Sequence, residues 1–552
     1  MKKLLIIFYA LLFVTIHSNA QSAMVQKVGK TVFSLTTYKE DGSILATSHG
    51  VYTGGTCEGI SSFTPFIGAS SAVVMDAAGR KYEVESIIGA NEMYDICRFN
   101  ISGGVAPVEV AQKTATGKVF AVGFSVNRPK ATPLTIKSSE KFMDKYNYYV
   151  FNEEVTDEIE GCPIANANGE IIGIVQRSKT NYDAHSTDIR YYSELESSGF
   201  AMRDPVLNKT KIRAALPVDK EQARLMLMMI DASYDSLAVV NTVKEYNNKY
   251  PGEIDGYTTL SNYLVNHDDI DQASRVMRDA INQATSKEEA YFEYARQIYN
   301  VAIFIPDSIQ NPWTLDLAEE NINKALAINP RSTYKHQLGQ ILYSKGDYQK
   351  AYNLFEEITN ADMAHSDVFF EMAQCKSHLG ASSSDILPYL DKCIEACPQP
   401  LTQVSAPYYF TRGVTLDAMG EYKKALQDYN VYDTLMYFRA APEFYYTRYK
   451  CNTQLRHYQQ ALNDIAHAAV IAPYEITYLA ELAALDLRLG MYEDAVKTCE
   501  ISFKVTTDSS DIYIIQGAAY MKLEKNEEAK TAFLKAKELG DDRADSYLEK
   551  LK

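Results

Sequence analysis

The pattern that organises the chain is an apolar stripe at helical spacing in which a small residue returns at a fixed interval. Alanine holds this place at Ala351, Ala425, Ala461, Ala495 and Ala529. The last three intervals are 36, 34 and 34 residues, and the first, 74 residues, spans two periods. A period near 34 predicts stacked pairs of antiparallel helices, because one pair alone cannot bury its apolar face.

A second column of small residues supports this prediction. Glycine stands twelve residues before the alanine at Gly339, Gly413 and Gly517, where two helices must approach closely. Turns such as Gly346-Asp-Tyr348 carry a ring that fills the wedge above the crossing. The pattern resembles the tetratricopeptide repeat, which implies a right-handed superhelix. The resemblance covers residues 218–552 in about eight or nine hairpins, and residues 331–540 hold the best units.

Strand-like runs replace the helical spacing between residues 24 and 203. Turn signals such as Asp41-Gly42 and Asn168-Gly169 separate them. Many short strands at close spacing predict a β-barrel or sandwich domain. The predicted strands are Thr31–Thr37, Ser71–Met75, Tyr82–Ile88, Val119–Gly123, Tyr148–Asn152 and Ile171–Gln176.

Residues 204–217 stand between these two regions. Pro205 and Pro217 bracket the segment, and a residue before proline is biased away from helix, so we expect a short linker there. The predicted fold class is multidomain, with an all-β domain at residues 24–203 followed by an all-α repeat array at residues 218–552.

Three stretches of the β region carry a family resemblance. They are His49–Ile60 with Phe66–Ser70, then Asn91–Phe99, and then Gly161–Ile174. Together they resemble the trypsin-like serine peptidases of bacterial periplasmic quality control. Because the spacing matches the whole domain of that family, the resemblance implies two β-barrels.

The resemblance also implies a catalytic triad, and two of its three places are changed here. The histidine place holds Thr64, and the serine place, three residues before Pro163, holds Glu160. Only Asp95 stands where the triad carboxylate is expected. An aspartate that orients a histidine has no catalytic use when the histidine and the nucleophile are missing. We therefore expect a degenerate domain without catalytic residues.

Three other interpretations stay open for this domain. His49 and His185 are its histidines, and His49 is expected to be a surface or turn residue. Cys162 could serve a displaced triad in a serine- or cysteine-type peptidase, although without a base nearby its thiol would stay protonated. The old substrate cleft could bind peptides without cutting them. The acidic loop around Glu160 is solvated or binds a cation or a basic peptide.

The first twenty residues have the form of an export signal. Lys2 and Lys3 precede an apolar run, Leu4–Ile16, and Ala20 ends a small-residue cleavage site. The run is too short to span a bilayer, and we expect no membrane span elsewhere. The resulting prediction is an exported protein, periplasmic or secreted after cleavage near Ala20.

Charge and cysteine usage narrow the possible ligands. Without Lys2 and Lys3 the chain has 53 basic and 71 acidic residues, a formal charge of −18, which argues against nucleic acid. The eight cysteines form no CxxC pair and no zinc-ligand spacing, so no metal or cofactor is predicted. Cys393 and Cys397 are expected to be buried. A disulfide among Cys57, Cys97 and Cys162 stays open.

The first helix of each repeat is expected to line a groove. Its mixed aromatic and aliphatic character suits a protein or peptide segment, and the lysine and asparagine positions that some family members use for acidic tails are occupied by other residues. Packing against neighbouring repeats is the alternative role for these side chains. The candidate groove residues are His336, Gln340, Tyr343, Phe410, Val414, Asp417, Tyr446, Lys450, Thr453, Leu487, Ile514 and Met521. The predicted function is a non-catalytic exported scaffold or adaptor with a pseudo-peptidase domain.

Overall fold

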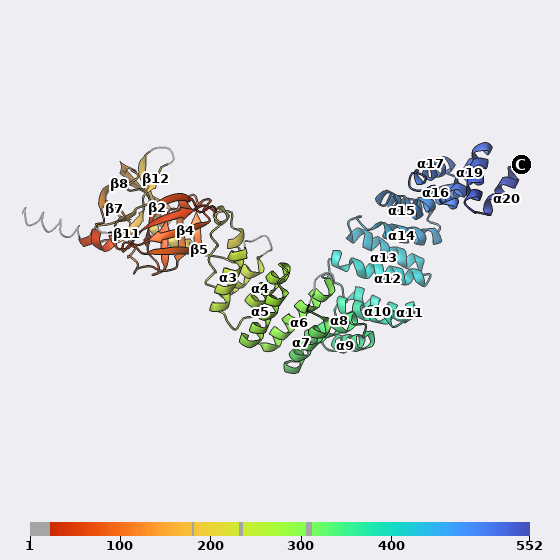
Figure 1. Ribbon diagram of the computed structural model, residues 1–552, viewed down its shortest axis with the longest axis horizontal. Coiled ribbons are helices and arrows are strands. Elements are labelled where there is room, and N and C mark those ends of the chain that lie inside the picture. Colours follow the sequence, from red (N-terminus) through yellow and green to blue (C-terminus); the bar gives the residue numbers. More distant parts are fainter. Residues whose placement is uncertain (1–22, 127, 179–181, 231–235, 305–311, 552) are drawn as a thin grey trace, which may run out of the picture. The chain divides into compact units, whose positions relative to one another are not determined.

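The computed structural model describes residues 23–126, 128–178, 182–230, 236–304 and 312–551 (Figure 1). The chain divides into two compact units, residues 1–293 and residues 294–552. Unit 1 holds the β domain and the first helices, and unit 2 holds the later helices. The expected export signal, residues 1–20, lies outside the described residues.

The first barrel of unit 1 is a closed antiparallel sheet of six strands. Its neighbours follow the order β1-β2-β3-β6-β5-β4, and β4 pairs back with β1. Alternate side chains point inward, so Phe33 and Leu35 are fully buried. The strands are β1 (Val32–Tyr38), β2 (Ile44–Tyr52), β3 (Glu58–Ser61), β4 (Ser71–Met75), β5 (Lys81–Asn91) and β6 (Ile96–Ile101).

The second barrel repeats this topology. Its sheet runs β11-β10-β7-β8-β9-β13-β12, and only Val175 separates β11 from β12. Taken as one strand, β11 and β12 give again the order first, second, third, sixth, fifth, fourth. This confirms the double-barrel fold expected from the sequence. The strands are β7 (Lys118–Val122), β8 (Ala131–Phe142), β9 (Tyr146–Glu154), β10 (Pro163–Ala165), β11 (Ile171–Ile174), β12 (Gln176–Arg177) and β13 (Asp183–Thr187).

The segment expected to be a linker, residues 204–217, packs along the first barrel. The Ile87 amide donates to the Arg213 carbonyl at 2.9 Å, and the Ala215 amide donates to the Ile87 carbonyl at 2.7 Å. Ile212 and Leu216 are buried in one apolar cluster with barrel residues and with the first helices. The barrel and α2–α4 therefore share a core. The helices of this region are α2 (Lys220–Met228), α3 (Ser236–Lys249), α4 (Asp255–Asn266) and α5 (Ile270–Gln283), followed by α6 (Lys287–Phe304).

Unit 2 is a stack of helical hairpins, and the small-residue columns lie at its helix crossings. All five column alanines are fully buried. A Cβ on Gly339 would lie 2.4 Å from the Phe355 ring, so the glycine permits the close approach. First helices are α8 (Ser332–Ser344), α10 (Ser366–His378), α12 (Ala406–Ala418), α14 (Pro442–Gln454), α16 (Ile476–Arg488) and α18 (Ser510–Lys522). Second helices are α9 (Tyr348–Ala361), α11 (Ser383–Glu395), α13 (Tyr422–Leu435), α15 (Tyr458–Ile471), α17 (Tyr492–Ser502) and α19 (Asn526–Glu538). Before the stack comes α7 (Leu315–Ile328), and after it comes α20 (Arg543–Lys550).

The structure also shows the state of the cysteines and the length and apolar character of the helices. Cys393 and Cys397 are buried, as expected, and Cys57, Cys97 and Cys162 are free thiols, so no disulfide joins them. Across the described part of the chain, no helix combines the length and the apolar character needed to cross a bilayer.

Candidate functional site

Thr64 and Asp95 are brought together at the edge of the first barrel. Thr64 opens a short 3-10 helix after β3, and Asp95 lies in the turn between β5 and β6 with φ of 44°. The Asp95 Oδ1 atom accepts hydrogen bonds from the Thr64 amide at 2.7 Å and from the Thr64 hydroxyl at 2.9 Å. Asp95 thus makes the contact that would orient a histidine, but its partner is a neutral hydroxyl that cannot act as a base at neutral pH.

Glu160 is held in an ion pair. The Arg177 guanidinium, on β12, donates to Glu160 Oε2 from Nε at 2.9 Å and from a terminal nitrogen at 2.7 Å. The same group contacts Asp157 at 2.8 Å. These carboxylates raise the pKa of Arg177 above its usual value. The place of a nucleophilic hydroxyl is therefore filled by a carboxylate that a cation fixes in position.

Cys162 has a histidine beside it. The Nδ1 atom of His49, on β2, lies 3.8 Å from the Cys162 sulfur and 3.2 Å from the Glu160 carbonyl oxygen. The expectation that no base lies near this thiol is therefore wrong. The chain brings the two residues together because Gly161 packs against Ser48 and His49, a contact between sequence-distant segments.

The surroundings of this pair favour its uncharged form. Cys162 is fully buried, and burial raises its pKa to about 12. Burial also lowers the pKa of His49. The thiol has a carbonyl acceptor, Glu158 O, at 3.5 Å. A reactive cysteine needs the thiolate, which this environment disfavours.

The turn that carries Asp95 is fastened to the second barrel. The Gln176 amide donates to the carbonyls of Tyr94 at 2.8 Å and Asp95 at 2.9 Å. The Thr187 hydroxyl donates to the Tyr94 carbonyl at 2.9 Å. His185, the second histidine of the domain, lies against the Tyr148 ring with centroids 5.6 Å apart. Neither of its ring nitrogens has a hydrogen-bond partner within the described residues.

On the repeats, the first candidate groove residues form a polar cluster between α8 and α10. The Glu371 carboxylate contacts His336 Nε2 at 2.6 Å and accepts from the Gln340 amide at 2.8 Å. Glu371 raises the pKa of His336, against the opposing effect of burial. Tyr343 packs edge-on against Tyr348 and His378.

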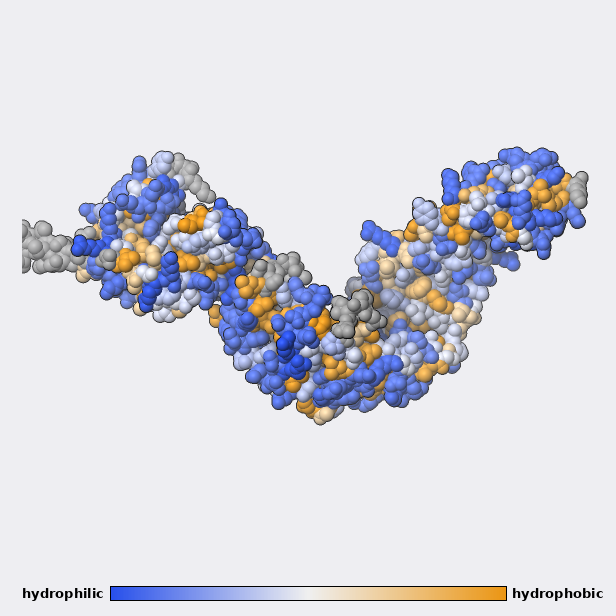
Figure 2. Space-filling model, in the orientation of Figure 1, coloured by the Kyte–Doolittle hydropathy of each residue, from blue (hydrophilic) through white to orange (hydrophobic). Residues whose placement is uncertain are grey.

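Further along, the first helices carry a row of rings. Phe410 packs against Tyr432 with centroids 5.1 Å apart, and Tyr446 packs against Tyr478 at 5.2 Å. Lys450 lies over the Tyr446 ring at 4.7 Å. On the face shown in Figure 2, white and orange residues gather over α12–α15 with blue residues along the rims. This stretch offers aromatic surface beside isolated charges.

The remaining candidates differ in exposure. Val414 and Lys450 are exposed, while Ile514 is buried among the last helices. Asp417 accepts from the Tyr429 hydroxyl at 3.2 Å, and burial raises its pKa. The half-buried candidates are His336, Gln340, Tyr343, Phe410, Asp417, Tyr446, Thr453, Leu487 and Met521.

Several polar residues of these sites escaped sequence reasoning. Arg177 and Gln176 act through partners in turns that are distant along the chain, and no local motif marks them. Glu371 lies in a repeat whose columns diverge. Arg448 bridges Asp433 at 2.9 Å and Asp464 at 2.7 Å between neighbouring hairpins. Its only sequence signal is a shared column, because Arg412 and Asp428 repeat the same spacing one unit earlier.

Comparison with known proteins supports the description of the helical repeats. The tetratricopeptide repeat model matches residues 332–364 and 510–539. A curated relative, the BBSome complex member BBS4 from Bos taurus, is 21% identical over 223 residues, which is 40% of this chain. The chain spans 41% of the length of that relative.

Among solved structures, the active form of the Rv3671c protease from M. tuberculosis resembles 37% of this chain and 89% of its own, with 14% identity and a TM-score of 0.29. At that score the match carries no weight of its own, so the β domain is assigned from its strand order. Two segments of the helical array thus match the tetratricopeptide repeat, and the β domain in front of them has a double-barrel fold in which both sheets share one strand order.

Proposed function

We propose that this protein is an exported, non-catalytic scaffold that binds a protein or peptide partner through the first helices of its repeats. The observation that carries the proposal is the pairing of Glu160 with Arg177 at the nucleophile place. Cleavage by the trypsin-like route needs a hydroxyl activated by a base, and Thr64 stands where that base would be. The β domain is then a pseudo-peptidase.

The half-buried rings on α12–α16 support the choice of partner. Aromatic side chains give large contact areas at low entropic cost, and repeats of this kind hold extended or helical segments. Phe410 and Tyr446 are the residues that we assign to this contact, with Lys450 and Asp417 setting the charge of the bound segment.

An activity-based probe tests the absence of catalysis. We expect the purified mature protein to stay unlabelled by a fluorophosphonate and to leave a casein substrate uncut. A trypsin-like peptidase serves as the positive control. Labelling that Glu160→Ala or Cys162→Ala removes would overturn the proposal.

One observation favours a second candidate function, a cysteine-type peptidase built on Cys162 and His49. The 3.8 Å contact between them is the arrangement that such an enzyme would begin from. It predicts epoxide labelling and cleavage that both Cys162→Ala and His49→Ala abolish. Cys57→Ala is the matched control, because Cys57 is an exposed thiol in the same domain.

Export is part of the proposal and has its own test. Expression in a bacterium with a periplasm should yield a mature protein that begins near Gln21, as read by N-terminal sequencing. Release by osmotic shock places it in the periplasm. Recovery of the unprocessed chain from the cytoplasm contradicts this part.

A further inference from the structure

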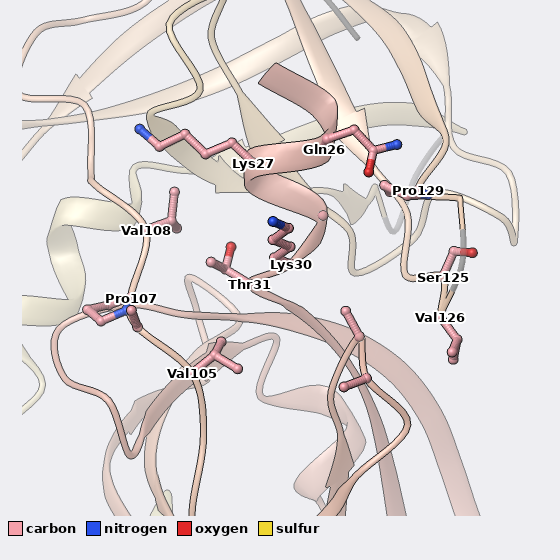
Figure 3. Close-up of a pocket in the computed structure, with 14 residues that line it drawn as sticks. Gln26, Lys27, Lys30, Thr31, Val105, Pro107, Val108, Ser125, Val126 and Pro129 are labelled. Atoms are coloured by element: carbon pink, nitrogen blue, oxygen red, sulfur yellow. The ribbon is translucent and has the colours of Figure 1, made fainter. Parts of the chain in front are cut away.

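A hollow of about 620 Å³ opens in the β domain, away from the triad positions. Its walls are formed by the helix at residues 23–29 with the two residues after it, by the loop at 105–108, and by residues 125, 126 and 129 (Figure 3). Ala77 and Ala78 complete the lining. The volume falls within the range typical of small-molecule sites. None of the residues that line it belongs to the sites described above.

The two loops give the hollow an apolar lining. Val105, Pro107 and Val108 face it from one side, and Val126 and Pro129 face it from the other (Figure 3). Val126 is 49% exposed although it is aliphatic. The wall is closely packed behind this lining, because a Cβ on Gly29 would lie 2.5 Å from Pro129. An alkyl chain would find contacts on both sides.

The helix and the turn that follows it give the hollow a cationic wall. Lys30 projects between the two loops in Figure 3, and it has no ion-pair partner in the part of the chain that the structure describes. Lys27 has only a loose 3.9 Å contact with Glu109, which is 77% exposed. No acidic residue stands among the described residues of the lining. The hollow is therefore apolar within and positive at its edge.

We propose that this hollow binds a fatty acid, with the carboxylate paired to Lys30 and the alkyl chain lying between Val105 and Val126. A carboxylate would form an ion pair with the Lys30 ammonium, and an unbranched alkyl chain would pack against the apolar walls. A neutral lipid would leave the Lys30 ammonium without an ion-pair partner in the hollow. A polar anion such as phosphate would leave the valines and prolines in water. This site is independent of the function proposed above.

Displacement of the fluorescent probe dansyl-undecanoic acid from the full mature chain tests the proposal. We expect dodecanoic acid to compete at a stoichiometry of one, and dodecanol to compete about tenfold more weakly, the size of one charge-assisted hydrogen bond. Dodecyltrimethylammonium should not compete. Equal competition by all three, or preferential binding of an apolar peptide with a free C-terminal carboxylate, overturns the proposal.

Two variants of Lys30 separate charge from folding. Lys30→Glu should abolish probe binding, and Lys30→Met, which keeps the length of the side chain, should make the acid and the alcohol bind equally. Lys81→Glu is the matched control, an exposed lysine on β5 outside the hollow. Circular dichroism verifies that each variant is folded. Unchanged acid binding in a folded Lys30→Met protein refutes the assigned contact.

Discussion

Asp95 keeps the hydrogen-bonding position of a triad carboxylate while its partner is the Thr64 hydroxyl. Since that hydroxyl neither accepts a proton at neutral pH nor carries one to a leaving group, the contact only holds the turn in place. Glu160 is fixed in the same way by Arg177. At the scale of single residues, each of these two carboxylates is therefore held by a neighbouring side chain, Asp95 by a hydrogen bond and Glu160 by an ion pair.

The buried thiol gives the first prediction at this scale. With its pKa raised to about 12, Cys162 stays protonated, and therefore unreactive, throughout the neutral range. Iodoacetamide at pH 8 should modify the exposed Cys57 and leave Cys162 unmodified, as read by peptide mass spectrometry. Modification of Cys162 at a rate similar to that of Cys57 would mean that His49 activates the thiol.

Asp486 gives the second prediction. This aspartate is 3% exposed, and burial raises its pKa from 3.8 to about 6. The folded state therefore holds the proton more tightly than the unfolded state. The contribution of protonated Asp486 to the free energy of unfolding is complete below pH 4. It declines as the pH rises from 4 to 6 and is absent above pH 6. The difference is up to about 3 kcal/mol.

Asp486→Asn removes that pH dependence. Asn452 occupies the same column one repeat earlier, so the amide fits this environment. Urea unfolding should show the variant more stable than the wild type at pH 8 and equal to it at pH 4. A variant that is equally destabilised at both pH values would show that the carboxylate is not the source of the effect.

Asp95 could be predicted because a motif surrounds it, whereas Arg177 could not, because its partners Asp157 and Glu160 lie in a turn that precedes β10. The pairing of Glu160 with Arg177 joins residues 17 positions apart in different elements. The contact between His49 and Cys162 spans 113 residues. Neither distance follows from residue types, so the sequence could single out Thr64, Asp95 and Glu160 but not the residues that surround them.

Among the elements, regular hairpins were predictable and irregular strands were not. The alanine and glycine columns repeat because every crossing imposes the same steric demand. β8 was missed because half of its residues are exposed, only Leu134 is buried, and its sequence shows no apolar alternation. β8 is instead held in the sheet by its pairing with β9, which runs from Ile136 to Phe142. A strand whose sequence shows no pattern of buried residues is therefore determined by its pairing with neighbouring strands.

The helix crossings give a prediction at the element scale. Gly339→Ala should destabilise the protein by about 1–2 kcal/mol, because the new methyl group meets the Phe355 ring at 2.4 Å and the clash exceeds the gain in helix propensity. Thr333→Ala, an exposed change in the same helix, is the control. Thermal unfolding measures both. Adding Phe355→Leu should restore part of the loss, and a stabilised Gly339→Ala protein would show that the crossing is looser than described.

For the molecule as a whole, the first barrel and the first helices depend on each other. Residues 204–217 were expected to separate two domains, but Ile212 and Leu216 share a core with the barrel and with α2. The two prolines suggested a connector because they break regular structure, and irregular backbone can still pack. The first compact unit accordingly extends to residue 293.

Truncation tests this dependence. A fragment of residues 21–203 should be less soluble than residues 21–293 and should melt at a lower temperature. It lacks three buried side chains of the segment at residues 204–217, Leu207, Ile212 and Leu216, each of which contributes roughly 1.5–3 kcal/mol when buried. Equal melting temperatures would show that the barrels form a stable domain without residues 204–217.

Site-specific photo-crosslinking tests the central claim most directly. A photoreactive phenylalanine at Tyr446 or at Phe410 should capture a partner chain in the native host, and the partner should be recovered intact. The same residue at Tyr474, 83% exposed in the turn after α15, should capture nothing above background. Capture at Tyr446 and Phe410 no greater than at Tyr474, or a captured partner cut by the wild type and spared by Cys162→Ala, would contradict the account.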